Sequence, residues 1–219
     1  MPPRGHGMVK GEAPMGKIVV SQFVTVDNVI EGPGDEPGFD RAGWAFRYNR
    51  GPEGDRYKFE EVMSAGGLLL GRKTYEGFAS VWPTMTDPAG FADKMNTMPK
   101  FVVSRTLTAE AWQNTRFIGR GEVTGGVAGG ATGNVAGAVA ALREHPGGDI
   151  LVNGSITLIE TLVAHDLIDE YRLMVFPVVL GAGRKLFGEA GAAPADLRLV
   201  ETRPVGDEGV LVQTYQRRG

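Results

Sequence analysis

The chain has 219 residues, and its 23 Lys and Arg against 26 Asp and Glu give a formal net charge of −3. This length fits one substantial α/β domain, which we take as the default. The charge balance excludes a general electrostatic attraction to nucleic acid or anionic lipid, so we expect neither as a partner.

Cysteine is absent, which excludes disulfides, thiolate zinc sites, iron–sulfur clusters and Cys nucleophiles. The three His, at positions 6, 145 and 165, lack the spacing of a metal site, so no metal is expected. There is neither the apolar stretch of a signal peptide nor an apolar run long enough to span a membrane. We therefore expect a cytoplasmic protein.

Residues 1–16 are rich in Pro, Gly and scattered charge, and they predict a disordered leader. A single domain is expected over 17–219, with a flexible Gly-rich insertion at about 119–137. The β-branched stretch Lys17–Val26 predicts a strand that feeds a turn-rich loop from Asp27 to Gly38. Gly54–Ala65 predicts a helix.

The middle of the chain alternates strands with helices, which predicts a mostly parallel sheet. Strands are expected at Gly67–Leu70, Lys100–Ser104 and Asp149–Val152, one more is expected to end near Ile118, and helices are expected from about Arg72, over Val135–Glu144 and over Ser155–Ala164. Strand patterns at Glu170–Pro177, Asp196–Thr202 and Gly209–Gln216 have only short connections between them, which predicts an antiparallel edge.

Two glycine-containing segments do not match the nucleotide-binding motifs that they resemble. Gly66–Thr74 is close to a phosphate loop, but Arg72 shifts the Lys-Thr pair and the residues between the glycines are those of a strand. Gly181-Ala182-Gly183 has Leu186 where a dinucleotide fingerprint needs its third glycine, so we interpret it as a turn.

Three junctions at the carboxyl ends of predicted strands suit an anion, because open α/β sheets bind ligands there and helix N-termini favour negative charge. The first holds Gly71, Arg72, Lys73 and Thr74, the second Ser104, Arg105 and Thr106, and the third Gly154, Ser155, Ile156 and Thr157. Each alone is also compatible with an ordinary turn that carries a hydroxyl cap and a solvated cation. Together they favour a phosphorylated dinucleotide.

Four stretches carry a more specific resemblance. They read VTVDNVIEGPG (24–34), LLLGRKTYEGF (68–78), PKFVVSRTL (99–107) and DILVNGSITLIETLVAHDLIDEYRLMVFPVVLGAGRKLF (149–187). In this order the chain resembles the dihydrofolate-reductase-like superfamily, over nearly all of 17–216. The branch it is most similar to contains the C-terminal reductase domain of the bifunctional riboflavin-biosynthesis deaminase/reductase.

The resemblance implies a mostly parallel sheet with an antiparallel edge, helices on both faces, NADPH as cofactor and a homodimer. It implies that the first junction meets the cofactor's phosphates and that the second holds the adenosine 2′-phosphate. The third, extended to Asn153, would face the pyrophosphate and the nicotinamide. This chain has Asn153-Gly154 where relatives often have Gly-Gly, and Asp27-Asn28 where Asp-Gly is common. Asn tolerates the left-handed conformation, so the turn at Asp27-Asn28 can still form.

Asp55 is the first candidate catalytic residue, with Asp27 as the next candidate for proton supply. Asp55 precedes Gly71 at about the place of the acidic residue that binds the pterin in dihydrofolate reductases, and its helical stripe with Phe59 and Val62 would direct it inward. There it would bind a protonated heterocycle or relay a proton. The alternative is that Asp55 only caps its helix.

Aromatic residues near this helix are candidates for the substrate wall. Trp44, Phe46 and Tyr48 would wall a flat heterocycle, or else anchor their loop on the core. Phe59 shares the Asp55 stripe and belongs to the same candidate set.

We therefore expect an NADPH-dependent reductase that transfers hydride to a C=N or C=O bond of a small, pterin- or pyrimidine-like substrate. An NADP(H)-binding sensor without turnover is the alternative. A purely structural protein is a further alternative, but it would require that the three junctions suit an anion only by chance.

Overall fold

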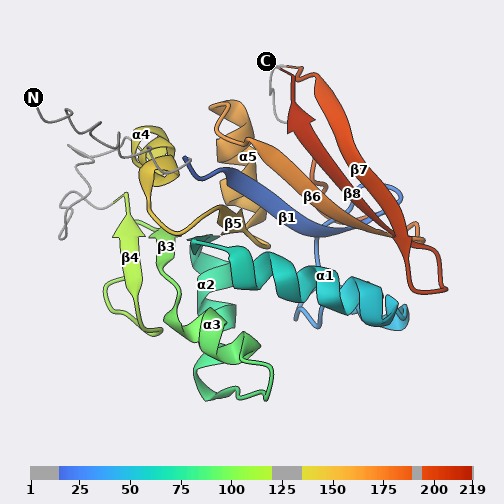
Figure 1. Ribbon diagram of the computed structural model, residues 1–219, viewed down its shortest axis with the longest axis horizontal. Helices are drawn as coiled ribbons and strands as arrows, with labels where there is room; N and C mark the ends of the chain where they lie inside the picture. Colours follow the sequence, from blue (N-terminus) through green and yellow to red (C-terminus); the bar gives the residue numbers. More distant parts are fainter. Residues whose placement is uncertain (1–14, 120–134, 189–193, 219) are drawn as a thin grey trace, which may run out of the picture.

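A computed structural model describes residues 15–119, 135–188 and 194–218 (Figure 1). The strands are β1 (Ile18–Thr25), β2 (Gly67–Gly71), β3 (Lys100–Val103), β4 (Thr115–Ile118), β5 (Ile150–Val152), β6 (Glu170–Phe176), β7 (Leu197–Val205) and β8 (Val210–Arg217). They form one sheet in the order β4-β3-β2-β5-β1-β6-β8-β7. The first six strands in that order are parallel, and β8 and β7 are antiparallel. The predicted α/β class and antiparallel edge are confirmed.

The helices are α1 (Gly51–Ser64), α2 (Arg72–Ala79), α3 (Phe91–Thr97), α4 (Val135–Ala140) and α5 (Ile156–Ala164), with short 3₁₀ helices at Trp44–Arg47, Trp82–Thr84 and Ala141–Glu144. The predicted helix over 135–144 is thus an α-helix followed by a 3₁₀ turn. The short α3 was not predicted. The predicted leader, except its last two residues, and most of the Gly-rich insertion lie outside the described residues.

The helices cover both faces of the sheet, and strand alternation decides which side chains meet them. Val19, Leu68 and Leu70 pack with residues of α1, α2 and α3. Val20 and Leu69 point the other way and pack with α4 and α5 (Figure 1). A third cluster, around Trp44 and Phe176, includes buried valines of the C-terminal strands β7 and β8.

The sheet has a switch in connectivity between its neighbours β2 and β5. The chain leaves β2 into α2, which packs on the α1–α3 face, and leaves β5 into α5, which packs on the opposite face. Where adjacent parallel strands send their connections to opposite faces, a crevice opens at the carboxyl ends of the strands. The fold therefore places a cleft beside Gly71 and Gly154.

β1 runs past the end of β5, because its pairing with β5 stops at Val20 whereas its pairing with β6 continues to Thr25. Two amide side chains bridge the strands where they separate. Gln22 Nε2 donates to the carbonyl oxygens of Val152 and Gly154, each over 3.1 Å, and Asn153 Nδ2 donates to that of Ser21 over 3.2 Å. The extended part of β1 thus borders the cleft without a neighbouring strand on that side.

Candidate active site

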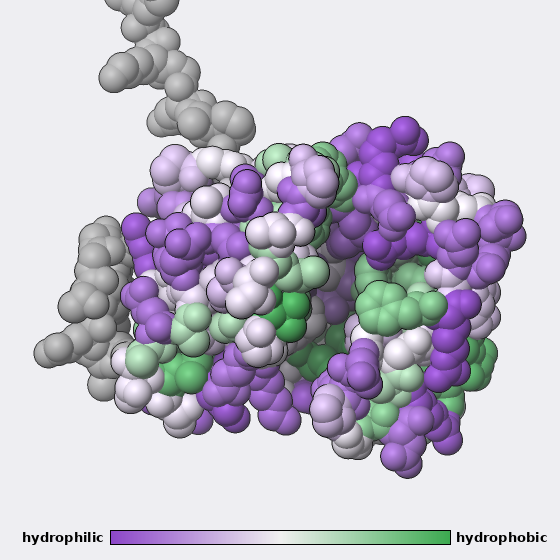
Figure 2. Space-filling view, turned by 90° about the horizontal axis from the view of Figure 1, so that it is seen from below, coloured by the Kyte–Doolittle hydropathy of each residue, from purple (hydrophilic) through white to green (hydrophobic). Residues whose placement is uncertain are grey.

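A cleft of about 760 Å³ occupies this switch point. It is lined by all the residues of the three predicted junctions, namely Gly71, Arg72, Lys73, Thr74, Ser104, Arg105, Thr106, Asn153, Gly154, Ser155, Ile156 and Thr157. The face shown in Figure 2 is hollowed near its middle, and both apolar and hydrophilic residues border the hollow. The sequence therefore predicted one side of the cleft residue by residue.

The first and third junctions are joined to each other by their hydroxyl groups. Ser155 Oγ accepts a hydrogen bond of 3.0 Å from the Gly71 N–H and donates to the Asn153 carbonyl, also over 3.0 Å. Thr74 Oγ1 accepts one of 2.8 Å from the Ser155 N–H. These hydroxyls are engaged in holding the turns against each other, a role the sequence did not reveal.

The backbone of the third junction is left-handed at two successive residues, with φ of 54° at Gly154 and 58° at Ser155. A Cβ at Gly154 would lie 3.0 Å from Thr74 Oγ1, so glycine is required both by conformation and by the approach of α2. Ser155 lacks that freedom, and its two hydrogen bonds to the first junction oppose the strain.

The second junction is a hydroxyl turn. Ser104 Oγ is buried and accepts hydrogen bonds from the N–H groups of Thr106 and Leu107, over 3.2 and 3.1 Å. This arrangement leaves the side chains of Arg105 and Thr106 exposed at the cleft. Ser104 therefore organises the turn, and Arg105 is the group available to a ligand.

The cations of this side differ in how they are paired. Arg72 Nη1 lies 3.0 Å from Glu76 Oε2 one helical turn along α2. Lys73 and Arg105 are exposed and have no salt-bridge partner among the described residues. Unpaired cations beside helix N-termini that have no side-chain cap fit a phosphorylated ligand.

Asp55 does not lie in the cleft, which corrects its predicted inward orientation. Its side chain is 67% exposed, and its carboxylate accepts a hydrogen bond of 2.6 Å from Arg50 Nε. It is no cap either, because α1 begins at Gly51 and Arg50 is the N-cap residue. The helix extends three residues further back than predicted, so Asp55 lies one turn inside it.

Asp27 also lies outside the residues that line the cleft. Its carboxylate accepts hydrogen bonds from the Thr25 hydroxyl (2.7 Å) and from the N–H groups of Gly181 (2.7 Å) and Leu180 (3.1 Å). Slight burial raises the pKa of Asp27, but these hydrogen bonds outweigh it and lower the pKa overall. A carboxylate so stabilised is a poor proton source; it fastens the loop after β1 to the Gly181 turn. The next residue, Asn28, has φ of 70°, as its predicted left-handed turn requires.

Of the four aromatic candidates, only Phe46 lines the cleft, and it is 75% exposed. Trp44 is fully buried and donates from Nε1 to the Glu31 carbonyl over 2.8 Å. Tyr48 packs on Phe176, with ring centroids 6.1 Å apart. Phe59 packs on Phe91 at 6.2 Å. Trp44 and Tyr48 therefore anchor their loop on the core, and Phe59 holds α1 against α3.

The other side of the cleft was missed by sequence reasoning. It comes mainly from β1, α1 and the loop between them, with Arg184 added from the segment after β6, and it includes Ser21, Gln22, Phe23, Ile30, Glu31, Pro33, Gly34, Glu36 and Lys58. One signal was available: the polar pair Ser21-Gln22 interrupts an otherwise apolar strand, and both residues are buried. Buried polar side chains need partners, so this pair marks a polar site.

The fold is that of the dihydrofolate-reductase-like class. The chain belongs to the RibD C-terminal domain family, a reductase-like family whose model matches residues 16–211. It is 28% identical over 206 residues to the Bacillus subtilis (strain 168) protein described as uncharacterized protein YyaP, covering 93% of this chain and 96% of that one. Within the described residues, no helix is long and apolar enough to cross a membrane.

Two solved structures share the fold. A putative riboflavin biosynthesis protein from Shewanella sp. PV-4 has a TM-score of 0.67 at 22% identity, covering 93% of this chain and 99% of that one. Dihydrofolate reductase from Enterococcus faecalis, complexed with NADP(H), has a TM-score of 0.54 at 16% identity, covering 94% and 98%.

Proposed function

We propose that the protein is an NADPH-dependent reductase that acts on a C=N or C=O bond of a small pyrimidine- or pterin-like compound. The proposal rests on one observation: three turns that are distant in sequence line one side of a single cleft. These turns contribute unpaired cations and helix N-termini without a side-chain cap. The family, and the cofactor complex of the similar dihydrofolate reductase, support the same cofactor.

The chemistry of the residues that line this side of the cleft suits the cofactor. Lys73 and the N-terminus of α2 would meet the phosphates, and Arg105 would meet the 2′-phosphate, because charge-assisted hydrogen bonds suit a dianion. The third junction would face the pyrophosphate and the nicotinamide. When bound, NADPH supplies the hydride; the chain itself needs to orient the two reactants and to exclude water.

The test is a titration of the protein with NADPH and NADH, followed by NADPH oxidation assays against a panel of pterins, pyrimidines, flavins and simple ketones. We expect tighter binding of NADPH and oxidation with at least one heteroaromatic acceptor. Equal affinity for the two cofactors would contradict the 2′-phosphate assignment. Tight NADPH binding without oxidation by any acceptor would favour a sensor over an enzyme.

We further propose that the protein is a homodimer and that β7 contributes to its interface. β7 is an outer edge of the sheet, and its Leu199 and Val200 are 48% and 49% exposed. An edge strand with exposed apolar residues needs a cover to avoid uncontrolled association. Light scattering at micromolar concentration should give twice the monomer mass, and Leu199→Lys should shift it toward the monomer. A monomer for the native chain would overturn the proposal.

A further inference from the structure

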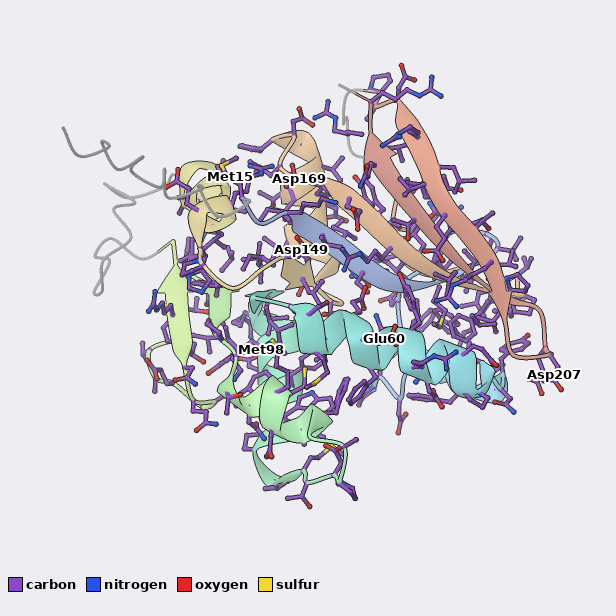
Figure 3. All side chains as sticks on the ribbon, in the orientation of Figure 1. Met15, Glu60, Met98, Asp149, Asp169 and Asp207 are labelled. Atoms are coloured by element: carbon purple, nitrogen blue, oxygen red, sulfur yellow. The ribbon has the colours of Figure 1, made fainter. Side chains whose placement is uncertain are left out.

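The side of the cleft opposite the cofactor turns contains a lysine whose surroundings are unusual. Lys58 comes from the middle of α1, lines the cleft, and has a side chain only 16% exposed. Its ammonium donates a hydrogen bond of 2.7 Å to Ser21 Oγ and another to Glu61 Oε2. Glu60, the neighbour of Glu61 on the same helix, is exposed (Figure 3). Lys58 and Glu61 therefore belong to the buried face of α1.

Glu61 fixes the position of the lysine. Its side chain is only 2% exposed; Oε2 also accepts a hydrogen bond of 2.9 Å from Ser21, and Oε1 lies 4.0 Å from Arg172 Nη1. A buried carboxylate is tolerated only when it is paired, and here two cations and a hydroxyl share it. Glu61 does not line the cleft, whereas Lys58 does. The cleft thus meets the positive member of the pair.

Arg172 links this pair to a set of charges at the amino end of the sheet. It lies 2.6 Å from Glu170 and 2.7 Å from Asp149, and Lys17 lies 2.7 Å from Glu170. Asp149 and Asp169 precede β5 and β6 and mark that end (Figure 3). Arg172 forms its short ion pairs with Glu170 and Asp149 and does not line the cleft. Lys58 is therefore the cation of this group of linked charges that borders the cleft.

Lys58 also keeps a donor for a ligand. An ammonium carries three N–H donors, and the described residues accept two of them. Its Nζ lies 5.7 Å from the centre of the Phe23 ring, and Phe23 lines the cleft as well. A flat apolar ring beside a held cation is a surface on which a heterocycle can lie with one oxygen toward the ammonium.

Two carboxylates also line the cleft, and each has a backbone partner of its own. Glu31 Oε2 accepts a hydrogen bond of 2.8 Å from the Arg184 N–H, and Glu36 Oε2 accepts one of 3.0 Å from the Gly32 N–H. Both serve the loop after β1. Asp55, the carboxylate that sequence reasoning assigned to a cationic heterocycle, lies outside the cleft. Of these two charged residues of α1, Lys58 and not Asp55 therefore lines the cleft.

We propose that Lys58 binds the substrate and selects a heterocycle that presents an electron-rich oxygen, such as a ring carbonyl or a carboxylate, instead of a protonated, cationic ring. Glu61 and Ser21 act as positioning residues for its ammonium. This inference rests on the proposed reductase function, which identifies the cleft as the place where the substrate meets the cofactor.

The test uses two small probes of opposite charge, uracil-6-carboxylate and 2,4-diaminopyrimidine, titrated calorimetrically into the NADPH-treated protein at slightly acid pH. Wild type should bind uracil-6-carboxylate more tightly. Lys58→Gln should weaken that binding by about tenfold or more and Lys58→Arg by less, since Arg keeps the charge. The matched control is Arg56→Gln, which removes an exposed cation from the same helix outside the cleft and should leave binding unchanged.

Uracil-6-carboxylate binding that is undetectable, or that is equal in Lys58→Gln and wild type, overturns the proposal, as does tighter wild-type binding of 2,4-diaminopyrimidine. If Lys58→Gln fails to fold because Glu61 loses its partner, the double variant Lys58→Gln/Glu61→Gln removes both charges together and should show the same loss. An NADPH titration of each protein separates the two hypotheses. Wild type that binds uracil-6-carboxylate through Lys58 but not NADPH would refute the proposed function and leave the role of Lys58 standing.

Discussion

The hydroxyl of Ser155 and the backbone N–H of Gly71 are joined by a hydrogen bond of 3.0 Å, although the residues are 84 positions apart in sequence. Because Ser155 is buried, its hydroxyl is the means by which the turn after β5 fixes the turn after β2. The geometry of the junction side of the cleft thus depends on a side chain whose hydroxyl is engaged within the protein.

Ser155→Ala should destabilise the protein by about 1–3 kcal/mol, because the partly buried Gly71 N–H loses its acceptor. Ser155→Gly removes the same hydroxyl but relieves the left-handed backbone, so it should cost less. Urea unfolding of the three proteins measures this order. Equal stability of Ser155→Ala and wild type would show that the hydrogen bond contributes nothing net.

Arg105→Ala should reduce the preference for NADPH over NADH by roughly ten- to a hundredfold, since one charge-assisted contact to the 2′-phosphate contributes about 1.5–3 kcal/mol. The loss should appear almost wholly in NADPH affinity. Fluorescence titration with both cofactors measures it, with Arg56→Ala as an exposed control outside the cleft. An equal weakening of both cofactors would place Arg105 elsewhere on the cofactor.

Asp55→Asn should leave turnover close to that of wild type and change the free energy of unfolding by no more than about 0.5 kcal/mol, because an exposed ion pair contributes little. Steady-state assays with any active acceptor, together with urea unfolding, test both statements. A fall in turnover by roughly a hundredfold would return Asp55 to the site.

Lys100 should make stability depend on pH. It is fully buried, its Nζ lies 4.2 Å from the centre of the Trp112 ring, and burial lowers its pKa from 10.5 to about 8. Between these values the unfolded chain binds more protons than the folded one, so the free energy of unfolding should rise as the pH increases through this window. Burial raises the pKa of Tyr57 and Tyr171 to about 12, which opposes the rise above pH 10.

Lys100→Met should abolish most of that rise, and Lys185→Met, at an exposed lysine, should keep it. Urea unfolding at several pH values between 7.5 and 10 compares the three proteins. A native profile that is flat or falls over this range would show that Lys100 keeps its proton in the folded state.

β2, β3 and β5 were predictable because they are short, largely apolar runs, and the junction side of the cleft followed because each of the three junctions comes directly after one of these strands. The short helix α3 was not, since it buries only Ala92 and Met95 and shows no repeating stripe. The helical periodicity correctly predicts that Asp55 and Val62 lie on the same side of α1. It does not predict which residues along that side are buried. Val62 is buried, whereas the Asp55 side chain is exposed one turn from the start of the helix.

The side of the cleft that carries Lys58 was hidden for a different reason. Lys58 and Glu61 are charged, and charged helix residues are normally assigned to solvent. Their burial depends on Ser21 and Arg172, which reach them from two neighbouring strands and are 37 or more positions away from Lys58 in sequence. A polar pair inside an apolar strand was the only local sign that such partners exist.

The amide bridges made by Gln22 and Asn153 have a mechanical consequence. They join β1 to β5 at the point where the strands separate, so the strands that border the two sides of the cleft belong to one hydrogen-bonded sheet and do not swing apart as two lobes. Entry and exit of ligands would then depend on the segment between β1 and α1, which forms a rim of the cleft and carries the exposed Phe46. We expect mutations in that rim to change rates of association and release, while the spacing between the two reactants stays constant.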